Sequence, residues 1–428
     1  MTTRAPETDP TMTGSKPTLP PSVPDRQRRS LFAAVAASAL AWTGTRAAAQ
    51  AAPTAPAAPP AAPMPATCHP AADWNAFVAR HVQRDGRVID FNTPQQHSTS
   101  EGQSYGMFFA LVHNDRELFA RVLGWAETNL ANGSVAKNLP AWQWGRKPGG
   151  GWGVLDPNPA SDADLWIAYA LMEAGRLWNE PRYASMGRSL LALVAREEVV
   201  SLSGFGRMLL PWPKSVASGS VWRLNPSYMP LQLLRYFQHA DPQGPWAAVA
   251  DNTVRLLAAT APRGFSPDWC AWSEDARAFV ADPEKGTVGS YDAIRVYLWA
   301  GMLAEQSPDR RALLQALAGP KRLLADRQPI PELVDTATGT VRGMGPLGFA
   351  GALLPYLKAQ DMPEALATEL ARLPNSRADG QPSTALLPYY EQMLLLFGQA
   401  WLDGRYQFLR NGQLQTSWRL LCRPTRTA

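Results

Sequence analysis

The chain has 428 residues, a length that suits one large domain with a leader, or two domains. Hydrophobic residues make up 46% of it and charged residues 18%, so the body holds enough apolar material for a sizeable core. The formal net charge is +5, but residues 1–66 carry +3 of it and leave +2 on the rest. A body this close to neutral lacks the basic surface that attracts nucleic acid, and we expect no nucleic-acid partner.

The first 50 residues have the pattern of an export signal. Arg28 and Arg29 precede an apolar run at Leu31–Trp42, and small residues follow that run. The run is too short to span a bilayer as a stable helix. The arginine pair resembles a twin-arginine signal, while an ordinary export signal that happens to carry two arginines is the alternative. We therefore expect cleavage near residues 49–52 and a periplasmic or secreted protein.

An Ala- and Pro-rich segment at 51–66 predicts a tether without a core of its own. The folded body then runs from 67 to 428 as one domain. No further apolar run in it approaches the roughly 18 residues that a membrane span needs, so we expect no stable membrane insertion.

Cysteine use is sparse, with Cys68, Cys270 and Cys422 along the whole chain. No two of them stand at metal-ligand spacing, which argues against a zinc site. Cys68 and Cys422 lie at the two ends of the body, and an oxidising compartment would allow them to form a disulfide. Cys270 would then be a buried free thiol.

Periodic apolar residues from Ala71 onward predict helices that follow one another in pairs. Near the end of the chain, 405–409 and 413–418 flank Asn411-Gly412, which predicts a β-hairpin. The predicted helices span 72–82, 102–113, 115–131, 162–179, 181–197, 226–238, 244–259, 290–306, 308–324, 346–358, 361–373 and 388–402.

Alternating helices joined by long loops rich in Gly, Pro and Trp favour an all-α toroid with six inner and six outer helices. In such a fold the starts of the inner helices gather on one face and form a cleft. A helical solenoid is the alternative, but the sequence has no fixed self-similarity at 30–45 residues.

Three acidic residues stand at predicted helix starts among Gly, Ser or aromatic residues: Glu101, Asp162 and Asp292. Each also has a purely structural interpretation. Glu101 suits the positive end of a helix, and Asp162 suits an N-cap. Asp292 stands three residues before Arg295, a spacing that suits a surface ion pair.

Taken together, the three acids point to hydrolysis of an acetal. That reaction needs a protonated carboxyl to protonate the leaving oxygen, and a second carboxylate that activates water or attacks directly. No nucleophile signature of Ser or Cys with His competes with this interpretation. The glycines at 149–151 lack the Lys-Ser/Thr that a phosphate-binding loop needs.

Aromatic residues gather beside these acids, and their flat faces suit the C–H face of a sugar ring. A row of such platforms is what a long, flat β-glucan requires. The aromatic residues concerned are Trp142, Trp144, Trp152, Trp166, Tyr228, Tyr291, Tyr389 and Tyr390.

Several of these segments resemble the family 8 glycoside hydrolases. The segment Ala160–Trp178 (ASDADLWIAYALMEAGRLW) fits the family's long signature, and Ser100–Met107 (SEGQSYGM) matches its general-acid motif. Tyr291–Arg295 (YDAIR) matches the motif that carries its general base. The segments 139–145, 225–228 and 264–269 look like the branch of the family that acts in bacterial cellulose synthesis, and the resemblance covers about Cys68 to Cys422.

The resemblance implies an (α/α)6 barrel, an inverting mechanism, and no metal or organic cofactor. It makes 67–428 the catalytic domain, with Glu101 as general acid and Asp292 as general base. Asp162 would hold the sugar at the cleavage point, and Asp164 would be structural. Tyr291 and Arg295 would orient Asp292 or its water, and the sugar platforms would be Trp142, Trp144, Tyr228 and Tyr389.

The sequence thus predicts an endo-β-1,4-glucanase linked to cellulose synthesis, with β-1,4-glucan as substrate and the cellulose export machinery as a candidate partner. The same chemistry on chitosan, xylan or mixed-linkage glucan is one alternative. A glucan-binding scaffold without catalysis is another, but the presence of all three acids argues against it.

Overall fold

The computed structural model describes residues 71–373 and 387–421, all within one compact unit that spans 62–428. The predicted export signal and tether, Cys68 and Cys422 lie outside these residues, so the disulfide stays a prediction. Cys270 is a buried free thiol, as the sequence suggested. Within the described ranges, no helix combines the length and the apolar character that crossing a membrane requires.

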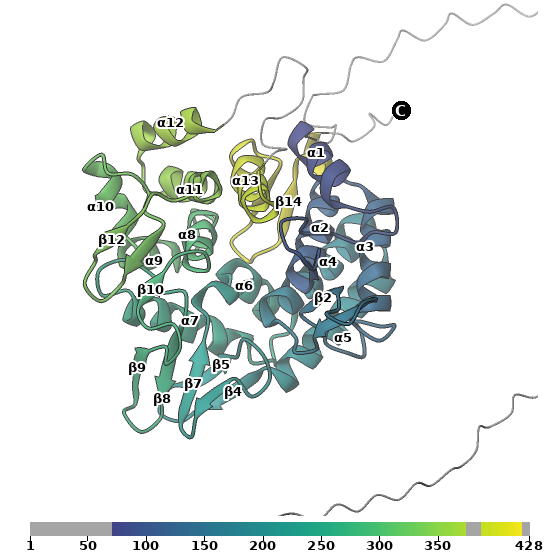
Figure 1. Ribbon diagram of the computed structural model, residues 1–428, viewed down its shortest axis with the longest axis horizontal. Coiled ribbons are helices and arrows are strands. Elements are labelled where there is room, and N and C mark those ends of the chain that lie inside the picture. Colours follow the sequence, from purple (N-terminus) through teal and green to yellow (C-terminus); the bar gives the residue numbers. More distant parts are fainter. Residues whose placement is uncertain (1–70, 374–386, 422–428) are drawn as a thin grey trace, which may run out of the picture. The chain divides into compact units, whose positions relative to one another are not determined.

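Helices are the main regular structure of the described chain (Figure 1). They begin and end close to the predicted positions in most cases. Their bounds are α1 Ala72–His81, α2 Ser100–Val112, α3 Arg116–Asn129, α4 Ser161–Trp178, α5 Pro181–Glu197, α6 Leu231–Ala240, α7 Trp246–Thr260, α8 Ala293–Gly301, α9 Arg310–Ala316, α10 Gly319–Ala325, α11 Leu347–Ala359, α12 Pro363–Arg372, α13 Tyr389–Leu402 and α14 Ser417–Leu421.

Two predicted helices are interrupted. The helix expected at 226–238 is a single 3-10 turn, η2 (Pro226–Tyr228), followed by α6 from Leu231, because Pro230 lacks the backbone N–H that would continue the turn. The helix expected at 308–324 divides into α9 and α10. Gly319 begins α10 and passes so close to Gly264 that a Cβ on it would lie 2.6 Å from the Gly264 carbonyl oxygen.

Six helices follow one another around the middle of the unit in Figure 1: α2, α4, α6, α8, α11 and α13. Each packs against the next in this order. Phe397 of α13 also contacts two phenylalanines of α2, with ring centroids 5.6 Å from Phe108 and 4.8 Å from Phe109. Helices α3, α5, α7 and α12 pack outside on α2, α4, α6 and α11.

The core lies between these helices and is rich in aromatic rings. Trp166 of α4 is fully buried and contacts Phe108 at 4.9 Å and Phe397 at 5.5 Å between ring centroids. Trp166 is therefore a core residue and not a sugar platform. Its burial among α2 and α13 fixes the first turn of α4, which carries Asp162.

Five small antiparallel sheets complete the described residues, and the sequence predicted one of them, the terminal hairpin β13–β14. The others are built from the long loops between helices. The sheets are β1 (Ser98–Thr99), β2 (Gln143–Arg146) and β3 (Trp152–Asp156); β4 (Val199–Leu202) and β5 (Gly206–Leu209); β6 (Val216–Ser218), β7 (Val221–Leu224), β8 (Cys270–Ser273) and β9 (Ala278–Ala281); β10 (Val288–Gly289), β11 (Leu333–Asp335) and β12 (Val341–Arg342); and β13 (Tyr406–Phe408) with β14 (Leu414–Thr416).

Candidate active site

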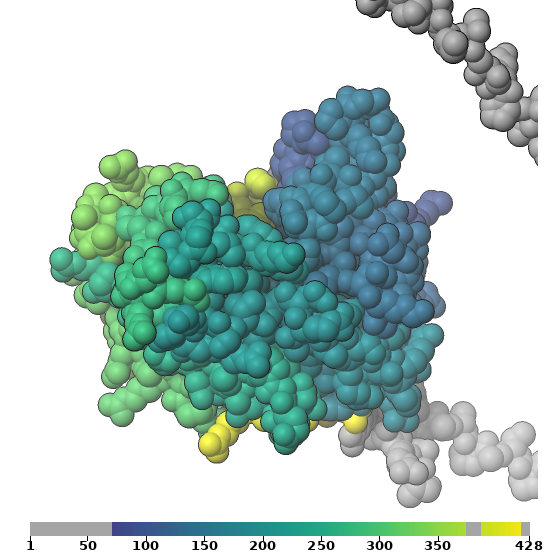
Figure 2. All heavy atoms as spheres, turned by 90° about the horizontal axis from the view of Figure 1, so that it is seen from below, coloured from purple at the N-terminus to yellow at the C-terminus, as the bar shows by residue number. Residues whose placement is uncertain are grey.

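A cleft of about 300 Å³ lies where the starts of α2, α8 and α13 meet. Figure 2 shows a notch between the blue and the green parts of the chain, with yellow atoms at its floor, and the lining residues come from these same three parts. They are Val88, Asp90, His97, Ser98, Thr99, Glu101, Gly102, Tyr105, Tyr291, Asp292, Arg295, Tyr389, Tyr390 and Met393. The structure thus brings two of the three predicted acids, Glu101 and Asp292, to one cleft.

Glu101 lies in the first turn of α2, close behind β1, and the residue as a whole is half-buried. The indole N–H of Trp142 donates to its Oε1 at 3.1 Å. Burial, and next the negative charge of Asp162, raise the pKa of Glu101 to about 8. Glu101 is therefore protonated at neutral pH and can donate a proton, which is the property that a general acid needs.

Gly102 allows a tyrosine to approach this acid. A Cβ on Gly102 would lie 2.9 Å from the hydroxyl oxygen of Tyr389, at the start of α13, so a larger residue would push that ring away. Tyr389 is half-buried, lines the cleft, and packs against His81 with ring centroids 5.5 Å apart. Tyr389 therefore lies at the cleft, and its role as a sugar platform stays a prediction.

Asp292 directly precedes α8 without capping it through its side chain, which is 32% exposed. Two donors hold its carboxylate: Arg295 Nη2 donates to Oδ1 at 2.7 Å, and Trp269 Nε1 donates to Oδ2 at 3.0 Å. Both bonds fix the orientation of the Asp292 carboxylate, and a carboxylate held in place beside a cleft is a group that could take a proton from water.

Arg295 joins two of the three acids. Its Nη1 donates to Asp162 Oδ2 at 2.9 Å and to the hydroxyl of Tyr105 at 3.2 Å, while its Nη2 binds Asp292. The Arg295 side chain is only 7% exposed, so its pair with Asp292 is part of a buried network and not a plain surface ion pair. The predicted contact between Arg295 and Asp292 is present.

Asp162 lies beneath this guanidinium in the first turn of α4, with 1% of its side chain exposed. Burial raises the pKa of Asp162 to about 6, although Arg295 opposes that shift. Because so little of the Asp162 side chain is exposed, few of its atoms could make the direct sugar contact that the sequence led us to expect. Its position instead lets it hold Arg295 and place negative charge near Glu101.

Two neighbours of Asp292 were not predicted as site residues. Asp268 accepts three backbone N–H bonds through one oxygen, from Ser290 at 2.7 Å, Asp292 at 3.0 Å and Ala293 at 2.7 Å, and so fixes the turn that presents Asp292. Burial and the nearby Asp292 raise the pKa of Asp268 to about 6. Trp269, the next residue, supplies the second donor to Asp292. Both lie more than 20 positions before α8, so no local spacing could relate them to Asp292.

Tyr105 was also missed, although its signal was within reach. It stands four residues after Glu101 on α2, and residues at this spacing share one helix face. Its hydroxyl accepts from Arg295. An i, i+4 test from the acid would have found it.

The predicted aromatic platforms have different positions. Trp142 is committed to Glu101 through its N–H, and Trp144 is half-buried against Trp152, with rings 5.4 Å apart and nearly parallel. Tyr228 is half-buried beside Trp269, and Arg295 lies 5.6 Å from its ring centroid. Trp142 thus orients Glu101 through its indole N–H, and its role as a sugar platform stays a prediction.

Tyr291 is 45% exposed at the edge of the cleft. Its hydroxyl donates to Glu332 Oε1 at 3.1 Å, and the role of orienting Asp292 or its water stays a prediction. Because its ring is exposed at the cleft, Tyr291 could pack against a sugar as a platform. Tyr390 supports it by donating its hydroxyl hydrogen to the Tyr291 carbonyl at 2.6 Å.

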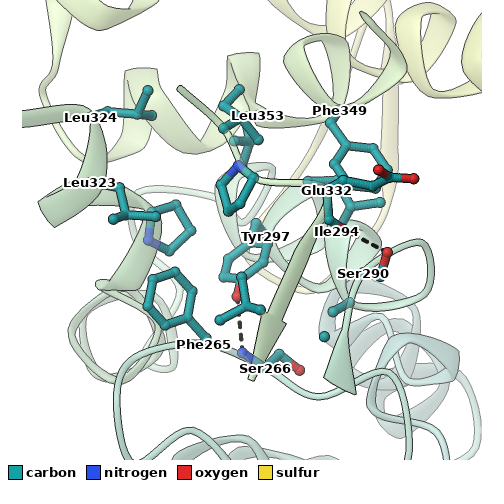
Figure 3. A pocket seen from close by; sticks show the side chains of 16 residues that line it. Phe265, Ser266, Ser290, Ile294, Tyr297, Leu323, Leu324, Glu332, Phe349 and Leu353 are labelled. Carbon is teal, nitrogen blue, oxygen red and sulfur yellow. Dashed lines mark hydrogen bonds between the residues drawn. The ribbon is translucent and has the colours of Figure 1, made fainter. Parts of the chain in front are cut away.

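Behind the turn that carries Asp292 lies a second, smaller cavity (Figure 3). It has about 30 Å³ of free space between apolar side chains, among them Leu323, Leu353 and Phe349. This volume matches about one water molecule and cannot admit a sugar ring. The cavity is a gap in the packing of α8, α10 and α11 and carries no chemistry of its own.

Comparison with known proteins agrees with this geometry. The model of the glycosyl hydrolases of family 8 matches residues 46–404. The Endoglucanase of Xanthomonas axonopodis pv. citri is 54% identical over 355 residues, which cover 83% of this chain and 91% of that protein. The Endoglucanase of Escherichia coli K12 is 43% identical over 349 residues, with 82% and 92% covered.

A solved structure, the endo-1,4-D-glucanase from Vibrio fischeri ES114, superposes with a TM-score of 0.73 at 38% identity. The superposition covers 81% of this chain and 99% of that one. The family model and these relatives each span most of the folded body. The chain therefore belongs to the glycosyl hydrolases of family 8.

Proposed function

We propose that this family 8 hydrolase is an inverting endo-β-1,4-glucanase, with Glu101 as general acid and Asp292 as general base. The observation that carries the proposal is the contrast between two carboxyls on one cleft. The pKa of Glu101 is raised to about 8, which keeps it protonated. Asp292 accepts hydrogen bonds from a guanidinium and an indole N–H, which hold its carboxylate at the cleft.

In this proposal Glu101 protonates the glycosidic oxygen as the bond to the anomeric carbon breaks. Asp292 takes a proton from a water molecule, which attacks that carbon from the opposite face. Arg295 holds Asp292 in place, and Asp162 holds Arg295. The glucan chain packs against five aromatic platforms, Trp142, Trp144, Tyr228, Tyr291 and Tyr389. Trp142 also orients Glu101.

The choice of β-1,4-glucan as substrate is supported by the names of the relatives, which are endoglucanases at 43% and 54% identity and an endo-1,4-D-glucanase at 38%. Chitosan, xylan and mixed-linkage glucan are the other substrates that the fold and the two carboxyls would allow. A reducing-sugar assay over soluble forms of all four polysaccharides separates them. Release of new ends from none of them would favour a scaffold protein instead.

We further propose that the six helices described above close an (α/α)6 barrel. The contacts of Phe397 with Phe108 and Phe109 support this, because they join the last helix of the series to the first. The contacts between successive inner helices also support it.

We also propose that the protein is exported through its N-terminal 50 residues and trims glucan chains in the periplasm during cellulose synthesis. The twin-arginine-like leader and the segments at 139–145, 225–228 and 264–269 support this. Fractionation of cells that express the full chain tests the compartment, and cytoplasmic protein with an intact leader would contradict it.

The inverting mechanism has a direct test in the product. Proton NMR of fresh product from a β-linked substrate should show the α-anomer first. If the β-anomer appears first, Asp292 is not a base, and Asp162 becomes a candidate nucleophile.

A further inference from the structure

We infer that Arg223 is a positioning residue for the hydrolysis, acting on the general base through the Trp269 indole. Arg223 lies on β7, and its guanidinium carbon is 4.9 Å from the centroid of the Trp269 ring. The indole N–H of that ring donates to Asp292 Oδ2 at 3.0 Å. The inference rests on the proposed function, since it takes Asp292 as the base.

The guanidinium is held firmly from its other side. Its Nε donates to Asp282 Oδ2 at 2.8 Å and its Nη2 donates to Asp282 Oδ1 at 3.1 Å, while Nη1 lies 2.7 Å from Glu284. The Asp282 side chain is fully buried and the Arg223 side chain is 9% exposed. A two-pronged buried pair of this kind fixes both the position and the plane of the guanidinium.

The sheet explains why these three residues meet. Arg223 pairs with Ala271 across β7 and β8, and Cys270 pairs with Ala281 across β8 and β9. Trp269 and Asp282 each continue their strands by one residue beyond that last pair. The sheet therefore sets Arg223 and Asp282 beside Trp269, in the order carboxylate, guanidinium, indole and base.

A cation over an indole face has two effects on the indole. It holds the ring by electrostatic attraction, and it draws electron density toward itself, which makes the N–H a better donor. Both effects strengthen the bond that orients Asp292. Asp292 has 32% of its side chain exposed and lies at a helix start, so its second donor decides how firmly it is aimed.

The chain offers a matched control in Arg235. This arginine donates to Asp309 at 2.8 and 2.9 Å and lies 2.9 Å from the exposed Asp251, so it repeats the arrangement of Arg223 with its two acids. It lies on α6 and does not line the cleft. Losing a buried guanidinium should therefore cost similar stability at either site, while only Arg223 contacts Trp269.

The test is a double-mutant cycle in the purified full-length enzyme with a soluble β-1,4-glucan. Arg223→Met should lower kcat roughly 10-fold, because small displacements of a catalytic group are costly, and leave KM within about twofold. Trp269→Phe should lower kcat by at least as much. The double variant should be no slower than Trp269→Phe alone, since Arg223 acts through that indole. Arg235→Met should keep wild-type kcat.

Further readouts separate positioning from simple loss of structure. Arg223→Lys keeps a cation near the ring and should recover most of the kcat lost in Arg223→Met. If Arg223→Met does not fold, Arg223→Gln, which is polar but uncharged, takes its place in the cycle. A lowered kcat with KM near the wild-type value in Arg223→Met is the second such readout, because general loss of structure would not single out kcat.

The inference would be overturned if the fold-loss of kcat in the double variant equalled the product of the losses in the two single variants. It would also be overturned if Arg235→Met lost as much kcat as Arg223→Met. Either outcome leaves the proposed function intact, because the wild-type enzyme would still be active. An inactive wild-type enzyme on every β-glucan would instead contradict the proposed function itself.

Discussion

Glu101 and Asp292 face the same cleft, yet their surroundings give them opposite properties. Glu101 meets a desolvated site with a second acid, Asp162, nearby, and its pKa rises to about 8. Asp292 meets a guanidinium, an indole N–H and partial exposure to solvent. In the proposed mechanism these neighbours divide two carboxyls of similar chemistry into acid and base, and Arg295 links Asp292 to Asp162.

The largest effect is expected when the proton donor, Glu101, is replaced by a side chain that cannot donate a proton to the glycosidic oxygen. Glu101→Gln keeps the size and shape of the side chain but cannot protonate the leaving oxygen. We expect kcat to fall about 10²–10⁴-fold, with glucan binding nearly unchanged. Steady-state kinetics and glucan binding by calorimetry check both parts. Glu117→Gln, at a side chain that is 93% exposed on α3, is the control. Activity within threefold of wild type would remove Glu101 from the role.

Removing the proposed base, Asp292, should stop turnover, and an added nucleophile should restore part of it. Asp292→Ala should lower kcat by about 100-fold or more, because no group then takes the proton from water. Azide needs no base and is small enough for the space left by the carboxylate, so it should restore part of the turnover. NMR should identify an α-glycosyl azide formed from the β-linked substrate. Azide should not rescue Glu101→Gln on the same unactivated substrate, and an equal rescue would contradict the division of roles.

A third variant tests how Asp162, whose negative charge raises the pKa of Glu101, affects the pH range of activity. The protonated form of Glu101 is the active one, so activity is present below about pH 8 and is lost as pH rises through that value. Asp162→Asn removes a neighbouring negative charge and should lower the pKa of Glu101. The alkaline limb of kcat/KM should then move to lower pH by about one unit. Asp309→Asn, which also loses a guanidinium partner but far from the cleft, should leave the limb in place.

The smallest expected effect concerns a second carboxyl pair beneath the acid side. Asp164 and Glu198 are fully buried, and burial raises the pKa of both. The folded protein then keeps a proton that the unfolded chain loses above about pH 4, so the free energy of unfolding should fall as pH rises. Glu198→Gln removes one of these groups and should reduce that fall by about 1 kcal/mol between pH 5 and 9. Urea unfolding across this range measures it.

Glu197→Gln is the matched control for this pair. Glu197 is the neighbouring residue, but its side chain is 46% exposed and pairs with Arg196. Its variant should follow the wild-type dependence on pH. If Glu198→Gln and Glu197→Gln have the same slope, the buried pair does not hold the extra proton.

The amino-acid sequence by itself determined much of this protein. Apolar periodicity located most of the helices, and Asn411-Gly412 located the terminal hairpin, because both signals depend on residues close together in the chain. The segments around Glu101, Asp162 and Asp292 indicated the family that the comparisons then confirmed. All three acids stand at the helix starts where the sequence placed them.

Tertiary structure decided what each of these residues can do. The partners of Asp292 come from Trp269 and Asp268, more than 20 residues away, and Arg295 reaches Asp162 across 133 positions. Burial, which sets the pKa of Glu101, depends on the packing of α2 against helices from both ends of the chain. Charge and solvation act through space, so a sequence can identify the carboxyls, but only their packed surroundings set the properties from which the roles of proton donor and proton acceptor are proposed.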